Sequence, residues 1–248
     1  MVLRENISST YQPEDRSLKF TSEEDVERYF ADQAALFTEA HYGTINNIKA
    51  PLNIELQKAL DDGPEESIQR VLTANPYLLQ YAMPNTGHHG VWVFPKRMIR
   101  TQQVDRTPGL IPDYLVAASN SLGYTWHIIE IKRRDTQFAS SNGRSLSSAG
   151  LKAVVQSATY LTHFHQYIET VRNNVGVSEI IQPENVIVLI GDSSTETPEQ
   201  AARRAEFEQI APKVKTVTYD RIVRGLRSDT RFRADVEKAI SPPVTVGA

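Results

Sequence analysis

Hydrophobic and polar positions recur with a changing period along the chain, and each change predicts a new secondary-structure element. Residues 64–80 place apolar side chains at helical spacing behind a proline and two acids, which favours the start of a helix. Residues 111–133, IPDYLVAASNSLGYTWHIIEIKR, indicate two strands joined by a turn at Ser121-Leu122. A near-continuous apolar run at 184–192 is typical of a strand that is covered on both faces.

The remaining segments complete the predicted order. Helices are expected at 21–43, at about 51–61, at 148–171 behind the capping residue Ser147, at 198–210 and from residue 221, and strands at 90–94, 98–104 and 213–220. From residue 61 the order is helix, a group of strands, helix, strand, helix, strand, helix, which predicts an α/β domain with a mixed central sheet flanked by helices. We interpret residues 1–60 as an N-terminal helical appendage and residues 61–240 as the main domain.

Two acids and a lysine stand at the open end of the predicted hairpin. Residues that face each other in a hairpin have a constant sum of residue numbers, which is 243 for a turn at Ser121-Leu122. Asp113 then lies opposite Glu130. Lys132 shares their face of the sheet because it follows Glu130 by two residues. A different turn would shift this register.

This constellation has the groups that metal-dependent phosphodiester hydrolysis needs. Two neighbouring carboxylates repel each other unless a cation joins them. Mg²⁺ binds oxygen ligands and typically uses one or two carboxylates, which leaves places for water and a substrate phosphate. A lysine beside the metal can orient or deprotonate the attacking water and offset the developing negative charge. The spacing by itself leaves open a surface hairpin with an ordinary Glu–Lys ion pair.

Composition and charge restrict the classes of protein to consider. The 248 residues contain no cysteine, which excludes disulfides and cysteine-rich zinc sites, and no stretch is apolar over the length that spans a bilayer. We therefore expect a cytoplasmic protein without a membrane partner. The net charge is −3, but residues 91–160 carry nine Lys/Arg against four acids, so this segment is +5 and the rest of the chain is −8. Such a segment can attract a polyanion to one face, although chance produces the same asymmetry.

A family resemblance gives the hairpin a more specific interpretation. Pro112-Asp113, sixteen further residues and Glu130-Ile131-Lys132 are similar to the PD-(D/E)XK nuclease motif. The segments PEESIQRVLTANPYLL, IPDYLVA, IIEIKR, SAGLKAVVQSATYL, VIVLIGD and VTYDRIV occur in the order of the Shedu nuclease domain. Shedu proteins are a PD-(D/E)XK family of bacterial anti-phage defence. The resemblance covers about residues 62–226, and it departs from the family where the strand at 186–192 ends in Gly-Asp and where VTYDRIV replaces a more acidic segment.

The resemblance implies a restriction-endonuclease-like core and a role for each motif residue. Asp113 and Glu130 would hold Mg²⁺, with Mn²⁺ as a substitute, and the main-chain carbonyl of Ile131 would be a further ligand. Lys132 would be the catalytic lysine. Glu65 matches an acid on the first helix of the domain, and its alternative role is to stabilise the start of that helix.

Other polar residues extend the predicted site toward DNA. Gln156 matches the glutamine on the helix after the motif lysine, and Lys152 lies one helical turn before it, where a solvated surface lysine is the alternative. Arg133, Arg134 and Arg144 are predicted contacts to backbone phosphates, with solvated loop residues as the alternative.

We therefore expect a Mg²⁺-dependent DNA endonuclease of the Shedu type that acts in antiviral defence. The modest net charge indicates a homo-oligomer or a partner that completes the DNA surface. The alternatives are a catalytically silent nucleic-acid-binding or scaffold module, and a nuclease of repair, recombination or restriction on the same fold.

Overall fold

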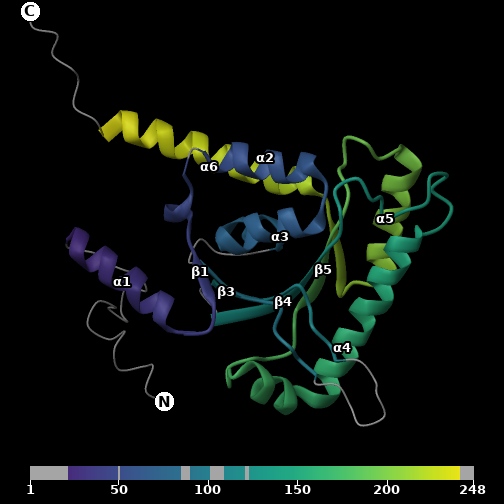
Figure 1. Cartoon of the computed structure of the whole chain (residues 1–248), viewed down its shortest axis with the longest axis horizontal. Helices are drawn as coiled ribbons and strands as arrows, with labels where there is room; N and C mark the ends of the chain where they lie inside the picture. The colour runs from purple at the N-terminus through teal and green to yellow at the C-terminus, as the bar shows by residue number, and fades with distance from the viewer. Residues whose placement is uncertain (1–21, 50, 85–89, 101–108, 121–122, 241–248) are drawn as a thin grey trace, which may run out of the picture.

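A computed structural model of the chain shows an α/β fold built on a six-stranded mixed sheet (Figure 1). It describes residues 22–49, 51–84, 90–100, 109–120 and 123–240. The strands are β1 (His41–Gly43), β2 (Val91–Pro95), β3 (Tyr114–Asn120), β4 (Gly123–Ile131), β5 (Asn185–Leu189) and β6 (Val214–Val217). They lie side by side in chain order: β1 to β4 pair antiparallel, whereas β4, β5 and β6 are parallel.

Helices cover both faces of this sheet. They are α1 (Glu23–Ala35), α2 (Leu52–Asp62), α3 (Glu65–Ala74), α4 (Ser148–Val175), α5 (Pro198–Ile210) and α6 (Tyr219–Ile240), with short 3₁₀ helices η3 (Ile45–Asn47) and η4 (Pro76–Ala82). In Figure 1, α2, α3 and α6 lie together on one face and α4 lies on the other. No helix in the described part of the chain combines the length and the apolar character that crossing a membrane requires.

Side chains from the two faces of β3 pack in two different hydrophobic cores. Tyr114 and Val116 pack with the apolar residues of α2, α3 and α6, whereas Leu115 and Ala117 pack with those of α4. Successive side chains of a strand point to opposite faces, so a strand between two helical layers is apolar at nearly every position. The same reason explains the apolar run of β5, all five residues of which are buried.

The predicted hairpin register is confirmed. Tyr114 pairs with Ile129 and Asn120 pairs with Gly123, so the sum of paired residue numbers is 243 throughout the described hairpin. The order of elements from residue 61 is also confirmed, as is the cap of α4, where the Ser147 hydroxyl accepts from the Gly150 amide at 2.9 Å.

Three predicted elements differ from the structure. The helix expected at 21–43 ends at Ala35, and residues 41–43 instead form the edge strand β1. The helix at 64–80 divides into α3 and η4 because Pro76 lacks the amide that a continuous helix needs. The strand expected at 98–104 is reduced in its described part to a single bridge between Arg100 and Leu110, and residues 101–104 lie outside the described residues.

Residues 41–49 and 51–62 belong to the same sheet and core as the rest of the domain. β1 pairs with β2, and α2 buries Leu52, Leu56 and Leu60 in the core that it shares with α3 and α6. A Cβ at Gly43 would lie 2.5 Å from the main-chain nitrogen of Tyr77, so β1 approaches η4 as closely as only a glycine allows. The predicted appendage thus contributes an edge strand and a helix to the main fold.

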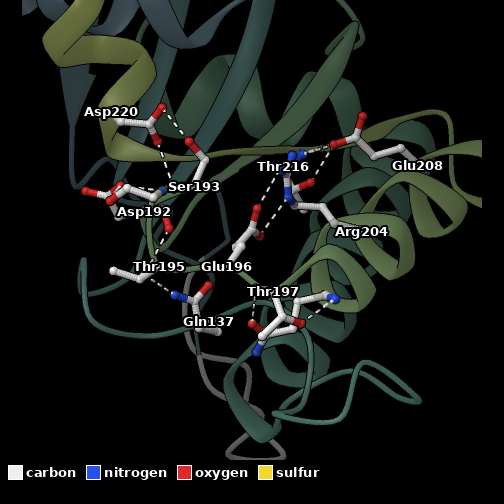
Figure 2. A network of polar contacts seen from close by, with 12 residues as sticks. Gln137, Asp192, Ser193, Thr195, Glu196, Thr197, Arg204, Glu208, Thr216 and Asp220 are labelled. Carbon is white, nitrogen blue, oxygen red and sulfur yellow. Dashed lines mark hydrogen bonds and ion pairs between the residues drawn. The ribbon is translucent and has the colours of Figure 1, made fainter.

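Polar contacts fix the loop that follows β5 (Figure 2). Asp192 is buried and accepts from the Ser194 amide at 2.9 Å, while the Ser193 amide donates to Asp220 at the start of α6 at 3.0 Å. The Gln137 amide donates to the Thr195 hydroxyl at 2.6 Å. These bonds join the loop to its neighbours at the end of the sheet where β4, β5 and β6 finish.

A buried histidine in β4 makes stability depend on pH. His127 is fully buried, neither ring nitrogen has a hydrogen-bond partner among the described residues, and burial lowers its pKa from 6.5 to about 4. A carboxylate oxygen of Glu184 lies 3.9 Å from its Nε2 atom, which is too far for a hydrogen bond. Between these pKa values the unfolded chain binds a proton that the folded chain does not, so stability falls as the pH drops below 6.5.

We predict that the free energy of unfolding of the wild type decreases by about 2 kcal/mol more than that of His127→Leu between pH 7.5 and pH 4.5. Urea unfolding at both pH values measures the difference. His165→Leu is the matched control because that imidazole is exposed on α4. An equal pH dependence in the wild type and His127→Leu would contradict the prediction.

Candidate active site

The open end of the β3–β4 hairpin brings two buried carboxylates together. Asp113 directly precedes β3, and Glu130 is the penultimate residue of β4. The exposed fractions are only 3% for Asp113 and 4% for Glu130. Carboxylates are rarely this buried without a partner.

Asp113 is held by the main chain and by a lysine. Its Oδ2 accepts from the Ile131 amide at 2.8 Å, and its Oδ1 is paired with the ammonium of Lys96. The Lys96 amide also donates to the Asp113 carbonyl at 2.9 Å. The side chain therefore bridges the ends of three neighbouring strands, because Lys96 directly follows β2.

Glu130 is held by a second lysine and by α4. Its Oε1 accepts from the Lys132 ammonium at 2.9 Å, and its Oε2 accepts from the Tyr160 hydroxyl at 3.2 Å. Tyr160 in turn accepts from the Gln156 amide at 2.7 Å, one turn earlier on α4. Gln156 thus reaches the predicted site through Tyr160.

The shifts in pKa follow from this burial. Burial raises the pKa of Glu130, the Asp113 carboxylate raises it further, and Lys132 opposes both. Burial lowers the pKa of Lys132, but the negative charges of Glu130, Glu65 and Asp113 outweigh burial and leave this pKa above its ordinary value. The side chain of Lys132 is consequently a protonated ammonium at neutral pH in the metal-free protein.

Glu65 borders the cluster from α3. It is half-buried, whereas its neighbour Glu66 is exposed. Burial raises the pKa of Glu65, and its carboxylate interacts electrostatically with Lys132, Asp113 and Lys96. Of the two acids in the first turn of α3, Glu65 is therefore the one that shares the electrostatic field of the site.

The main chain of Lys132 is fixed on two sides. Its amide donates to the Leu189 carbonyl at 2.8 Å, and its carbonyl accepts from the Tyr219 hydroxyl at 2.6 Å. Ile131, between the two motif residues, buries its side chain in the core on the opposite face. The sequence Glu-Ile-Lys thus alternates between site and core.

Lys152 and Arg144 do not join the carboxylate cluster. Lys152 is exposed on α4 one turn before Gln156, and no residue in the described part of the chain pairs with its ammonium. Arg144 is exposed in the loop between β4 and α4, where its amide donates to Asn142 at 3.0 Å.

Arg133 and Arg134 are engaged by acids. Arg133 donates to Asp135 at 2.9 Å, and Arg134 donates to Asp61 at 2.7 Å and to Asp192 at 2.9 Å. Arg134 joins α2 to the loop after β5, so its guanidinium links elements of the fold. The acids that pair with these arginines offset their positive charge, so a DNA phosphate would compete with a carboxylate for each guanidinium.

Sequence reasoning missed Lys96 and Tyr160. Tyr160 follows Gln156 by one helical turn, and this spacing was a usable signal that both share one face of the helix. Lys96 gave no comparable signal. It stands opposite Asp113 because Pro95 pairs with Tyr114, and the β2–β3 register depends on a long connection between the strands.

The donor set fits a hard divalent cation. Asp113 and Glu130 provide carboxylate oxygens from adjacent strands, and burial together with the negative charge of Asp113 raises the pKa of Glu130, a cost that a bound cation would relieve. No group of three or more acids or histidines in the described residues is arranged to hold a metal ion. The remaining ligands would therefore be water, main-chain oxygen or substrate.

Comparison with known proteins does not assign the chain to a family. No protein-family profile matches the sequence, and a search of curated proteins finds no match. The resemblance to the Shedu nuclease domain stays a prediction based on the motifs.

The repulsion in the cluster leads to a prediction about stability. Ionised Glu130 is disfavoured in the folded chain, so a neutral isostere should stabilise the metal-free protein. We expect Glu130→Gln to increase the free energy of unfolding at pH 7.5 in EDTA. Thermal and urea unfolding measure this change.

Acidic pH provides the internal control for this variant. The difference in free energy of unfolding between Glu130→Gln and the wild type should become smaller as the pH falls. At low pH the Glu130 carboxyl of the wild type is protonated and, like the glutamine amide, carries no charge. A Glu130→Gln protein less stable than the wild type at pH 7.5 would show that the ion pair with Lys132 outweighs burial and repulsion.

Proposed function

We propose that this protein is a Mg²⁺-dependent DNA endonuclease with a PD-(D/E)XK core of the Shedu type. The observation that carries the proposal is the buried cluster of Asp113, Glu130 and Lys132 at one end of the hairpin. A structural ion pair on a surface hairpin would be exposed and would contain one acid. Two buried acids that repel each other are costly unless they serve a site.

Asp113 and Glu130 would hold the divalent cation, with the Ile131 carbonyl as the predicted third protein ligand. The cation would supply charge stabilisation and a more acidic bound water. Tyr160 and Gln156 orient the Glu130 carboxylate from α4 through hydrogen bonds of 3.2 Å and 2.7 Å. Glu65 adds negative charge at the border of the site.

Lys132 would act as an ammonium. Its raised pKa favours a role in orienting water and stabilising negative charge on the scissile phosphate over a role as a base. Its position is well defined because β5 and α6 bind its main chain on both sides. Such preorganisation makes electrostatic stabilisation effective.

DNA is the substrate proposed from the charge distribution and the resemblance. The basic segment 91–160 contains both lysines that face the carboxylates, and the exposed Lys152 lies one turn from Gln156. Contacts of this type bind phosphates without reading the sequence. The proposal includes a homo-oligomer that completes the DNA surface and a role in antiviral defence in the bacterial cytoplasm.

We predict that the wild type nicks or cuts supercoiled plasmid in Mg²⁺ or Mn²⁺ and does not in EDTA. Lys132→Met and Asp113→Asn should reduce the rate by about a hundredfold or more, because each removes a charge that acts on the reacting phosphate or its metal. Glu130→Gln should be equally defective. Gel electrophoresis of the plasmid forms measures the rates.

Lys213→Met is the matched control for the lysine variant. Lys213 is exposed directly before β6, at the opposite end of the parallel strands from Lys132, and its replacement should leave cleavage unchanged. Equal cleavage by the wild type and all three site variants would refute the assignment. DNA binding without cleavage in either metal would favour a silent binding module.

A further inference from the structure

Lys96 adopts a backbone conformation that is unfavourable for its residue type. Its φ is 50°, and no other non-glycine residue in the described segments has a positive φ. A lysine gains nothing from the left-handed region, which favours Gly and Asn. Strain of this kind persists where the surrounding structure imposes it, often at functional sites. At Lys96, the strained turn brings the ammonium onto Asp113.

The strands on either side fix the placement of Lys96. Pro95 is paired with Tyr114, so the next residue of each strand, Lys96 and Asp113, face each other across the end of the sheet. The Lys96 amide donates to the Asp113 carbonyl at 2.9 Å, which continues the ladder by one further bond. The register therefore places Lys96 and Asp113 opposite each other, where their side chains form the ion pair.

The two lysines of the cluster differ in exposure. The side chain of Lys96 is 52% exposed, whereas that of Lys132 is 20% exposed. Lys96 thus lies on the solvent side of Asp113, and its ammonium can return to water at a small desolvation cost. Lys132 remains held by Glu130.

The charges of the cluster are nearly balanced without any metal. Asp113, Glu130 and Glu65 contribute three negative charges, and Lys96 and Lys132 contribute two positive charges. A divalent cation that binds Asp113 competes for the oxygen that Lys96 already occupies. The more exposed of the two ammonium groups is the one that can leave.

We propose that Lys96 is a built-in counter-ion of Asp113 that competes with the divalent cation and so sets the metal concentration at which the site fills. This inference rests on the metal site of the proposed function. It assigns Lys96 a positioning and regulatory role that is separate from catalysis by Lys132. It also explains why a carboxylate pair can stay folded and buried before a metal arrives.

Mn²⁺ binding tests the inference without a measurement of activity. Titration of free Mn²⁺ by electron paramagnetic resonance gives the dissociation constant for the wild type, Lys96→Gln and Lys96→Asn. Both variants remove the ammonium, and Asn also suits the positive φ of this position. We expect each variant to bind Mn²⁺ about two- to fivefold more tightly than the wild type, the range for loss of a partly exposed ion pair.

Arg97→Gln is the matched control for charge. It removes one positive charge at the adjacent residue, but Arg97 is paired with Glu39 at 2.7 Å and not with the cluster. Its Mn²⁺ affinity should equal that of the wild type. A similar gain in Arg97→Gln would mean that net charge, and not the contact with Asp113, sets the affinity, and would overturn the inference.

Glu130→Gln separates failure of this inference from failure of the proposed function. Loss of Mn²⁺ binding in Glu130→Gln, together with unchanged or weaker binding in both Lys96 variants, would overturn the role of Lys96 and leave the metal site standing. Absence of Mn²⁺ binding in the wild type and in both Lys96 variants would overturn this inference and the proposed metal site together. If the metal site existed, removal of the competing ammonium should make Mn²⁺ binding detectable.

Discussion

The hydrogen bond from the Ile131 amide to Asp113 is the contact on which the candidate site depends. At 2.8 Å it continues the β3–β4 pairing one step beyond the last pair of the hairpin with a side chain as acceptor. It holds the Asp113 carboxylate against β4, next to Glu130. A slip of one residue would turn every side chain of one strand to the other face and would send the acid into the opposite core. The register is therefore a condition for both folding and the site.

The same end of the sheet combines stabilising and destabilising interactions. Both cores bury strand residues on their own face, and the aromatic side chains of Tyr160 and Tyr219 approach the site from α4 and α6 with their hydroxyl groups. These groups satisfy polar atoms that the sheet leaves unpaired at its end. Against this, Glu130 is an ionisable group whose pKa is raised because the fold buries it beside another acid. The packing of the rest of the domain thus compensates for the unfavourable burial of the two acids, and such local cost is common at functional sites.

Prediction from the sequence succeeded where local pattern was decisive. The two-residue turn predicted from the sequence implied the register that the described strands show, and this register placed Asp113 with Glu130. Prediction failed where contacts with a distant segment of the chain determined the local structure. Residues 41–43 follow a helical pattern but pair with β2, because the edge of the sheet offers them main-chain hydrogen bonds and a closely packed neighbour in η4. The arginines after Lys132 looked available for phosphate, yet Arg134 is bound by acids from two other elements.

The sequence alone determined that Glu130 and Lys132 share a face of their strand, because they are two residues apart, and it predicted the two-residue turn that pairs Asp113 with Glu130. Only the tertiary structure decided which groups surround them. Lys96, Glu65 and Tyr160 come from β2, α3 and α4, and their approach depends on strand order and helix packing that no local pattern encodes. Electrostatic interaction depends on distance in space, so the charge balance of the site appears only after the chain has folded.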